Sequence, residues 1–187
     1  MPTQSGFHIE ICTYSEGGSY EETSFEPIDG AGADCSDSGR VQDEVIVNGG
    51  KFELYSGTIT GNTATKGNGG GIYGKGAITL TDATVTGNNR YDVYYDGKES
   101  TTPELTVSGS VQAGYYANEA WKLPIFVSGA LSEDSVIHVG VYEGIKPGYG
   151  KSLAIAEPAS GVTLSAENFK ADAADSETSL GKDGKVY

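Results

Sequence analysis

The feature that most constrains the fold is a segment that recurs, with changes, 26 residues further along the chain. Residues 52–62 (FELYSGTITGN) align without a gap with residues 78–88 (ITLTDATVTGN). Both copies place apolar residues at the same three positions and end in Gly-Asn. The matched pairs are Phe52/Ile78, Leu54/Leu80, Ile59/Val85, Gly61/Gly87 and Asn62/Asn88. A fixed offset of this size indicates a structural unit that packs against copies of itself.

Within each copy, apolar and polar residues alternate with a period of two, which is the pattern of a half-buried β-strand. Shortened copies lie at 105–111 and 125–131, and Gly57, Gly109 and Gly129 take the same place in their copies. The chain contains 28 glycines and much Thr and Ser, which makes it a poor helix former. We therefore predict an all-β protein.

Two all-β architectures can use such a unit. A sandwich pairs neighbouring strands as antiparallel hairpins, whereas a solenoid pairs each strand with its counterpart one unit later. Residue types match at the fixed offset and not across turns, which favours the solenoid, with Leu54 lying over Leu80. Asn62 and Asn88 would then occupy a corner in the left-handed conformation, with their side-chain amides bonded to each other.

The blocks 56–62 (SGTITGN), 69–73 (GGGIY) and 82–88 (DATVTGN) resemble the degenerate coils of bacterial right-handed parallel β-helix surface proteins. These include adhesin-like proteins and polymorphic outer-membrane-type repeats. The resemblance covers about residues 45–115 and continues more weakly over 120–187. It implies a short right-handed parallel β-helix with irregular N- and C-terminal caps. It implies less about function, because this architecture serves adhesins, polysaccharide lyases, hydrolases and spacers.

On this basis we divide the chain into an N-terminal cap or leader (1–44), parallel β-helix coils (45–118) and C-terminal β-rich coils with a cap (119–187). A solenoid exposes its terminal coils and needs caps. Cys12 and Cys35 either form a disulfide that staples the first part, worth about 3 kcal/mol, or remain two buried free thiols.

The spacing of the corners changes in the C-terminal part, where prolines also appear. Residues 136–142 and 152–156 carry apolar alternation and are predicted to be further strands. Residues 166–174 are predicted to form one short helix. We expect this part to finish the stack.

The formal net charge is −14, from 12 basic and 26 acidic residues, and it repels nucleic acid and anionic membranes. No apolar run reaches the roughly 18 residues of a membrane span. The N-terminus lacks a basic-then-apolar signal peptide, so export would require a signal that has been removed. We expect a secreted or cell-surface protein that binds no nucleic acid and does not insert into a membrane.

No nucleophile-elbow, zinc-protease or phosphate-loop motif is present, and the cysteines and histidines do not have zinc-site spacing. We therefore expect no cofactor and no metal. Acidic loops can supply the oxygens that Ca²⁺ needs, but no calcium-loop pattern occurs, so a solvated acidic surface is the favoured interpretation.

Carboxylates are the candidate catalytic groups. Asp82, Asp92 and Asp96 fall within one predicted coil, with Arg90 nearby. The resemblance to β-helix lyases and hydrolases would give them roles in cleaving polysaccharide. However, Asp96 begins an Asp-Gly turn dipeptide and Asp82 replaces a serine at a corner, so structural roles are favoured.

An aromatic group suggests a binding face instead. Its members are Tyr91, Tyr94, Tyr95, Tyr115, Tyr116 and Trp121. Exposed rings stack on sugars, and tyrosine hydroxyls add hydrogen bonds. The alternative is that alternate tyrosines fill the interior.

We predict a non-enzymatic, adhesin-like module that binds a glycan or a protein along its side. The alternatives are a fragment of a polysaccharide lyase or glycoside hydrolase, and an inert structural stalk. A strand edge at an exposed end would also permit self-association with another chain.

Overall fold

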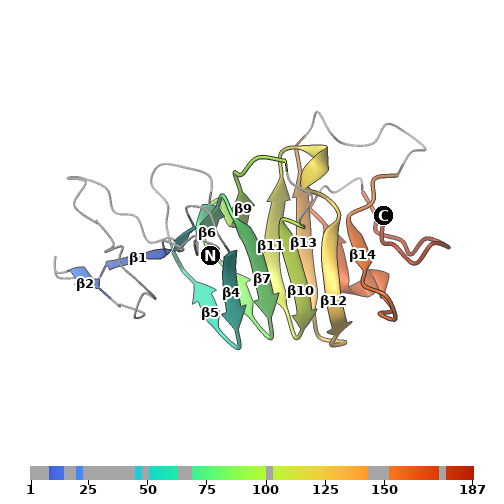
Figure 1. Cartoon of the computed structure of the whole chain (residues 1–187), viewed down its shortest axis with the longest axis horizontal. Coiled ribbons are helices and arrows are strands. Elements are labelled where there is room, and N and C mark those ends of the chain that lie inside the picture. Colours follow the sequence, from blue (N-terminus) through green and yellow to red (C-terminus); the bar gives the residue numbers. More distant parts are fainter. Residues whose placement is uncertain are drawn as a thin grey trace, which may run out of the picture.

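We describe residues 9–14, 20–22, 45–47, 51–62, 69–99, 103–142, 152–172 and 176–187 of a computed structural model, with only the backbone for those before residue 51. Their regular structure is β-strand apart from short 3₁₀ turns, and two sheets hold the strands (Figure 1). The first sheet contains β4 (Lys51–Tyr55), β7 (Ala77–Thr81), β10 (Leu105–Gly109), β12 (Ile125–Leu131) and β14 (Ala156–Pro158).

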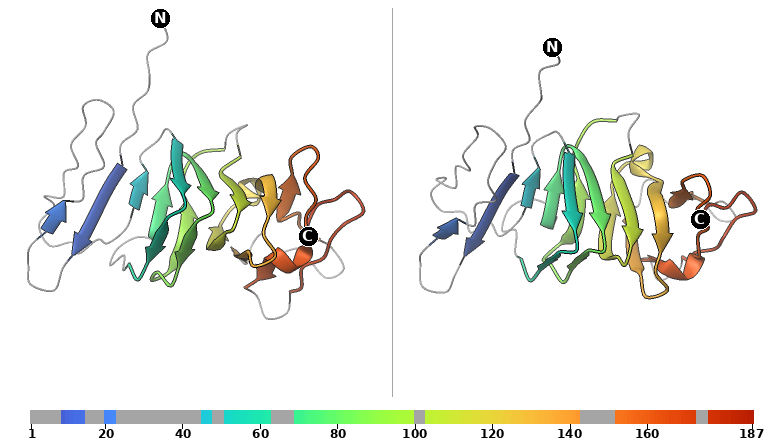
Figure 2. Two further views of the ribbon diagram at one scale, coloured as in Figure 1. Left: turned by 90° about the horizontal axis from the view of Figure 1, so that it is seen from below. Right: turned by 60° about the horizontal axis from the view of Figure 1, so that its bottom comes forward.

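The second sheet contains the remaining strands. In spatial order these are β2 (Tyr20–Glu22), β1 (Ile9–Tyr14), β3 (Val45–Val47), β6 (Gly69–Gly74), β9 (Tyr91–Tyr95), β11 (Gln112–Ala117), β13 (Val136–Val141) and β15 (Phe169–Ala171), with β5 (Thr58–Thr60) and β8 (Thr84–Thr86) joined beside β11. All of these pairings are parallel except those of β1 with β2 and β3. Figure 2 shows the strands crossing the long axis one after another.

Strand register agrees with the offset in the sequence. Phe52 pairs with Ile78 and Leu54 with Leu80 between β4 and β7, and β5 and β8 pair in the same way. The prediction that segments 26 residues apart lie side by side in the same direction is confirmed for these strands. These strands are therefore not paired as antiparallel hairpins.

The core lies between the sheets and consists of rows of apolar residues that follow the pairing. Ile78, Leu80, Val107, Ile125 and Val127 are fully buried on the first sheet. Each buried aliphatic side chain of this size contributes about 1.5–3 kcal/mol. Their counterparts on the second sheet are Ile72, Val85, Val93, Ala113, Tyr115, Ile137, Val139 and Phe169.

The corner after the first sheet requires a left-handed residue. Ser56, Asp82 and Gly109 take it, with φ of 54°, 49° and 71°. Gly109 therefore corresponds to Ser56, and the expectation that it corresponds to Gly57 is wrong by one residue. Glycine reaches this conformation without strain, whereas other residues incur a cost of about 1–2 kcal/mol. Asp82 offsets the cost because its Oδ1 accepts a hydrogen bond from the Ser110 amide at 2.8 Å.

The next corner corrects a second expectation. The left-handed residues are Gly61 and Gly87 (φ 76° and 69°), one position before the asparagines. The Asn88 side chain accepts from the Asn62 amide at 3.1 Å and donates to the Ile59 carbonyl at 3.2 Å. Asn88 thus satisfies backbone groups of the preceding corner, and no amide-to-amide bond joins the two asparagine side chains.

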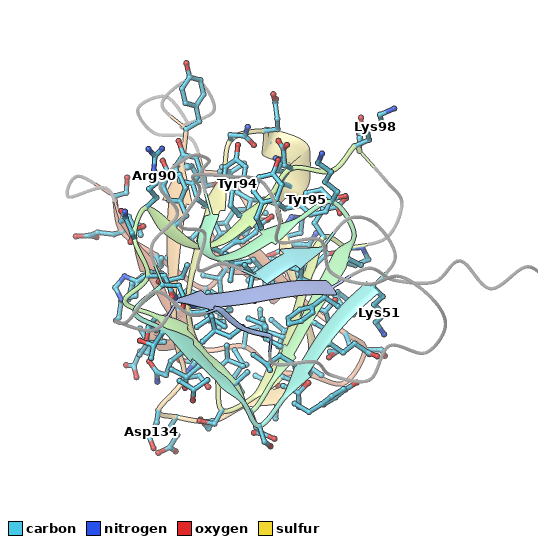
Figure 3. The ribbon with its side chains drawn as sticks, turned by 90° about the vertical axis from the view of Figure 1, so that its left-hand side faces the viewer. Lys51, Arg90, Tyr94, Tyr95, Lys98 and Asp134 are labelled. Carbon is cyan, nitrogen blue, oxygen red and sulfur yellow. The ribbon has the colours of Figure 1, made fainter. Side chains whose placement is uncertain are left out.

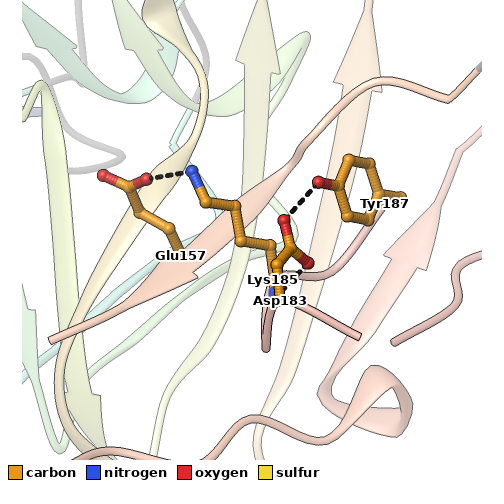
Figure 4. A network of polar contacts seen from close by, with 4 residues as sticks. All are labelled: Glu157, Asp183, Lys185 and Tyr187. Carbon is orange, nitrogen blue, oxygen red and sulfur yellow. Dashed lines mark hydrogen bonds and ion pairs between the residues drawn. The ribbon is translucent and has the colours of Figure 1, made fainter. Parts of the chain in front are cut away.

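The last residues of the chain cover the end of the stack. Val186 is fully buried and pairs antiparallel with Ala156, and its carbonyl accepts from the Ile155 amide at 2.8 Å. Beside it, Lys185 forms an ion pair with Glu157 at 2.8 Å (Figure 4). The strand predicted at 152–156 begins only at Ala156.

The helix predicted over 166–174 is wrong. Ala166–Asn168 form a 3₁₀ turn and Phe169–Ala171 form β15. Phe169 is fully buried and pairs with Ile137, so burial of its ring in the sheet overrides the local helical tendency. The sheets also continue past residue 118, because β12 pairs with β10 and β13 with β11.

The predicted disulfide involves Cys35, which lies outside the described residues, and it stays a prediction. The predicted N-terminal cap contributes β1, which pairs antiparallel with β3 and so ends the parallel run of the second sheet. No helix in the described part of the chain is long and apolar enough to cross a membrane.

Candidate functional site

The alternation of β-strands divides the predicted tyrosine group. Tyr95 and Tyr115 point inward and are 3% and 1% exposed. Their neighbours Tyr94 and Tyr116 lie on the outer face of the same strands. Desolvation raises the pKa of the inward pair, and the buried Tyr115 hydroxyl donates to the Lys122 carbonyl at 3.1 Å. The Tyr115 ring is therefore a core residue, and the Tyr95 ring is buried almost as completely.

Four tyrosines on the outer face of β6, β9 and β11 form what we call the tyrosine stack: Tyr73, Tyr91, Tyr94 and Tyr116. Neighbouring ring centroids lie 3.9–6.2 Å apart with interplanar angles of 12–17°. Tyr73 was not in the predicted group, and it comes from the Gly-Gly-Gly-Ile-Tyr block. The side chain of Trp121, in the turn Ala120–Lys122, is not described.

The rings of the tyrosine stack turn their faces to one another. Tyr91 and Tyr116 are closest, with centroids 3.9 Å apart. Tyr94 in the middle is 4% exposed, and its hydroxyl accepts a hydrogen bond from Asn118 at 3.1 Å. The outer side of Tyr116 lies against Gly140, where a Cβ atom would come within 3.0 Å of the ring. A sugar that stacks on an aromatic face finds mainly ring edges and hydroxyls here.

Asp82 and Asp96 lie at two different corners, and Asp92, in β9, bonds to a third. Asp82 stabilises the corner between β7 and β8, and the Asp92 carboxylate accepts from the Asn88 amide between β8 and β9 at 2.9 Å. Asp96 follows β9 and accepts from the Tyr73 hydroxyl. They do not converge on one site, and no cluster of metal-ligating side chains occurs among the residues described.

A second surface, which the sequence analysis missed, is a groove on the outer face of the first sheet. Its volume is about 1140 Å³. Its floor is formed by outward residues of β7, β10 and β12, including Thr79, Thr106, Phe126 and Ser128. Its remaining lining residues are Lys51, Lys75, Gly76, Ala77, Tyr95, Asp96, Gly97, Lys98, Glu99, Pro103 and Glu104.

The groove exists because one corner is longer than its counterpart. Between β6 and β7 only Lys75 and Gly76 intervene, whereas residues 96–104 separate β9 from β10, and we call the described ones, 96–99 and 103–104, the detour. Both ends of this detour are hydrogen-bonded to the strands that flank the preceding corner, β6 and β7. The Asp96 amide donates to the Gly74 carbonyl at 2.6 Å, and the Glu104 carbonyl accepts from the Ile78 amide at 2.9 Å.

Two titratable groups, Tyr95 and Glu104, line the groove, and the buried ammonium group of Lys122 lies close to Tyr95. Glu104 is 5% exposed, and desolvation raises the pKa of its carboxyl, although a hydrogen bond to Tyr95 and the charge of Lys122 oppose this. Lys122 is 3% exposed, and desolvation lowers the pKa of its ammonium group. That group lies 5.2 Å from the centroid of the Tyr94 ring and 5.5 Å from that of Tyr95. Groups perturbed by burial beside a cavity are typical of functional sites.

Comparison of the chain with models of protein families, with curated proteins and with solved structures finds no match.

Proposed function

We propose that this chain is a module of a secreted or cell-surface protein, wound as a short right-handed parallel β-helix, that binds a glycan along its side without cleaving it. The winding is supported by the course of the chain, which leaves the first sheet, passes through the second and returns one strand further along. Connections between parallel strands of one sheet are almost always right-handed.

The observation that carries the binding function is the groove. Its floor combines the Phe126 ring with the hydroxyls of Thr79, Thr106 and Ser128. Sugars need both kinds of contact, because their ring faces are apolar and their edges carry hydroxyl groups. The volume of about 1140 Å³ exceeds the usual range of roughly 300–1,000 Å³ for small-ligand pockets and suits several linked sugar units.

We assign the glycan to the groove and not to the tyrosine stack, because the stacked rings already cover one another's faces. The absence of catalysis is supported by the separate positions of Asp82, Asp92 and Asp96. A carboxylate pair that hydrolyses a glycosidic bond must flank that bond, with separations of about 5–10 Å.

The test is a binding measurement on a panel of neutral and acidic polysaccharides, followed by calorimetry on those that bind. Phe126→Ala should weaken binding about tenfold, since one stacked aromatic ring is worth about 1.5 kcal/mol. Tyr142→Ala removes an exposed ring outside the groove and is the matched control, with no expected change. Tyr91→Ala should also leave affinity unchanged.

Three outcomes contradict the proposal. Binding that depends on Tyr91 and not on Phe126 would move the site to the tyrosine stack. New reducing or unsaturated ends in the incubated polysaccharide would make the chain an enzyme. Binding to no glycan on the panel would favour the inert stalk.

A further inference from the structure

We propose that the groove selects anionic glycans, whose carboxylate or sulfate groups are bound by Lys51, Lys75 and Lys98. This inference rests on the proposed function and specifies its ligand class. It follows from the distribution of charge around the groove and does not depend on the sequence repeat.

Cations gather at the groove although the chain as a whole is strongly acidic. Acidic residues outnumber basic ones by 26 to 12, yet three lysines line this one surface. Lys51 comes from β4, Lys75 from the tight corner and Lys98 from the detour, so three separate segments bring them together. Figure 3 shows Lys51 and Lys98 projecting from the same side of the molecule.

Two of these lysines have no carboxylate partner within the described part of the chain. Lys51 forms an exposed ion pair with Glu53 at 2.6 Å, whereas neither Lys75 nor Lys98 forms an ion pair with a described residue. Their side chains are exposed. Exposed lysines are compact, mobile charges that suit carboxylate and sulfate groups spaced along a flexible polymer.

The acidic residues of the groove oppose this attraction less than their number suggests. Asp96 accepts a hydrogen bond from the Tyr73 hydroxyl. Glu104 is buried at the inner wall, where the charge of Lys122 acts on its carboxylate. Asp96 and Glu99 are the exposed carboxylates of the lining, facing the exposed ammonium groups of Lys51, Lys75 and Lys98. An anion in the groove therefore meets the exposed ammonium groups of Lys75 and Lys98, neither of which forms an ion pair with a described residue.

The attraction between exposed lysines and an anionic ligand makes the interaction dependent on salt. At physiological ionic strength the Debye length is about 8 Å, so repulsion by distant carboxylates is already screened, and further salt chiefly weakens the attraction to the exposed lysines. We expect binding of anionic glycans to weaken steadily with added NaCl, and binding of any neutral glycan to be insensitive to it.

The experiment compares two charge-reversed variants of the full chain. Lys75→Glu/Lys98→Glu changes the groove, and Lys170→Glu/Lys182→Glu makes the same change in net charge at exposed positions outside it. Polygalacturonate and dextran sulfate provide carboxylate and sulfate ligands, neutral galactan and dextran are the uncharged references, and poly-glutamate is an acidic polymer without sugar rings. Thermal melting of both variants establishes that they are folded.

We expect the groove variant to lose at least tenfold in affinity for one or both anionic glycans while the control variant changes less than twofold. Equal loss in both variants, or tight binding of neutral glycans that is unaffected by Lys75→Glu/Lys98→Glu, overturns the anionic preference and leaves the proposed function standing. Poly-glutamate bound as tightly as polygalacturonate overturns the preference for sugars. Binding of no polymer at all removes the proposed function itself.

Discussion

The tyrosine stack lies on the outer face of the second sheet and the groove on the outer face of the first, and the two surfaces differ in what fills the space above the sheet. In the tyrosine stack, side chains from β6, β9 and β11 have equivalent positions and close on one another, with Tyr91 and Tyr116 only 3.9 Å apart at their centroids. In the groove, the described residues of the detour, 96–99 and 103–104, line the side of the floor, and a volume of about 1140 Å³ is left unfilled. Where strands pair regularly, equivalent side chains pack together and cover the face of the sheet. Where one corner is longer than its counterpart, space above the sheet stays open.

The position of the long corner changes along the chain. The segment between β8 and β9 is short and β11 spans the equivalent region without a break, pairing with β8 at Ala113 and with β9 at Tyr115. The segments after β9 and β11 are longer and include the detour and the turn Ala120–Lys122. A change in loop position that leaves the ladders intact is enough to create a site on a regular scaffold.

The largest effect we predict is a difference in stability between variants at an inward and an outward position of β11. Tyr115→Ala removes a ring that is 1% exposed and should lower the free energy of unfolding by about 3–5 kcal/mol. Tyr116→Ala removes its outward neighbour and should cost about 1–2 kcal/mol. Urea denaturation measures both. Equal losses would mean that the outer face is packed as a second core, and the contrast between the two regions would fail.

The next effect concerns the contact between the detour and the Tyr95 side chain. Tyr95 packs its ring against Gly97, and its hydroxyl donates to the Lys98 carbonyl at 3.3 Å. A Cβ atom at position 97 would overlap the Tyr95 ring and hydroxyl, so Gly97→Ala should destabilise the protein by about 1–3 kcal/mol. Gly129→Ala is the milder comparison, because its added Cβ would lie 3.3 Å from the Ser108 Cβ and requires a shift of only a few tenths of an ångström.

Gly97→Ala should also weaken glycan binding, because the detour must move away from Tyr95 and change the shape of the groove. Thermal melting and calorimetry on the same two variants report stability and affinity together. Full stability with full affinity for Gly97→Ala would show that the detour is not fixed by this contact.

The sequence predicted those parts of the fold that repeat. Leu54 and Leu80 could be matched because burial requires an apolar residue at each level of a ladder. The groove could not be predicted, since its lining combines Lys75, Lys98 and Phe126 from segments that share no pattern. The sequence also did not determine which face of the sheet each tyrosine side chain occupies. Alternation distinguishes Tyr94 from Tyr95, but which of the two points inward depends on the register of β9 with β6.

A smaller effect tests the tyrosine stack directly. Tyr91→Leu retains an apolar side chain and removes the stacking on Tyr116, so it should cost about 0.5–1.5 kcal/mol. It should also bring the pKa of Tyr116 down from about 12, because hydrogen bonding and charge interaction with Tyr91 contribute to that value after desolvation. Alkaline titration followed by tyrosinate absorbance measures the pKa, with Tyr116→Phe identifying the signal. An unchanged titration would show that the pair does not interact in solution.

The smallest effect is a change in the free energy of unfolding with pH, and it arises from Glu104 in the groove. Desolvation raises the pKa of Glu104 above the ordinary value of 4.5, despite the opposing hydrogen bond to Tyr95 and the charge of Lys122. Above pH 4.5 the unfolded chain therefore loses this proton before the folded chain does, and the folded protein becomes less stable as pH rises through that window. Glu104→Gln has no proton to lose, so its stability relative to the wild type should increase from pH 4.5 towards neutrality.

Lys122 affects the free energy of unfolding in a different pH range. Its pKa is lowered from 10.5 by desolvation, so its contribution to stability rises with pH just below that value and does not reproduce the Glu104 slope. Glu133→Gln, at an exposed position outside the groove lining, is the control variant. If Glu104→Gln runs parallel to the wild type at every pH, Glu104 is solvated in solution. The inner wall of the groove would then be open to water, and the buried Lys122 would lose the desolvated environment that distinguishes this face from the tyrosine stack.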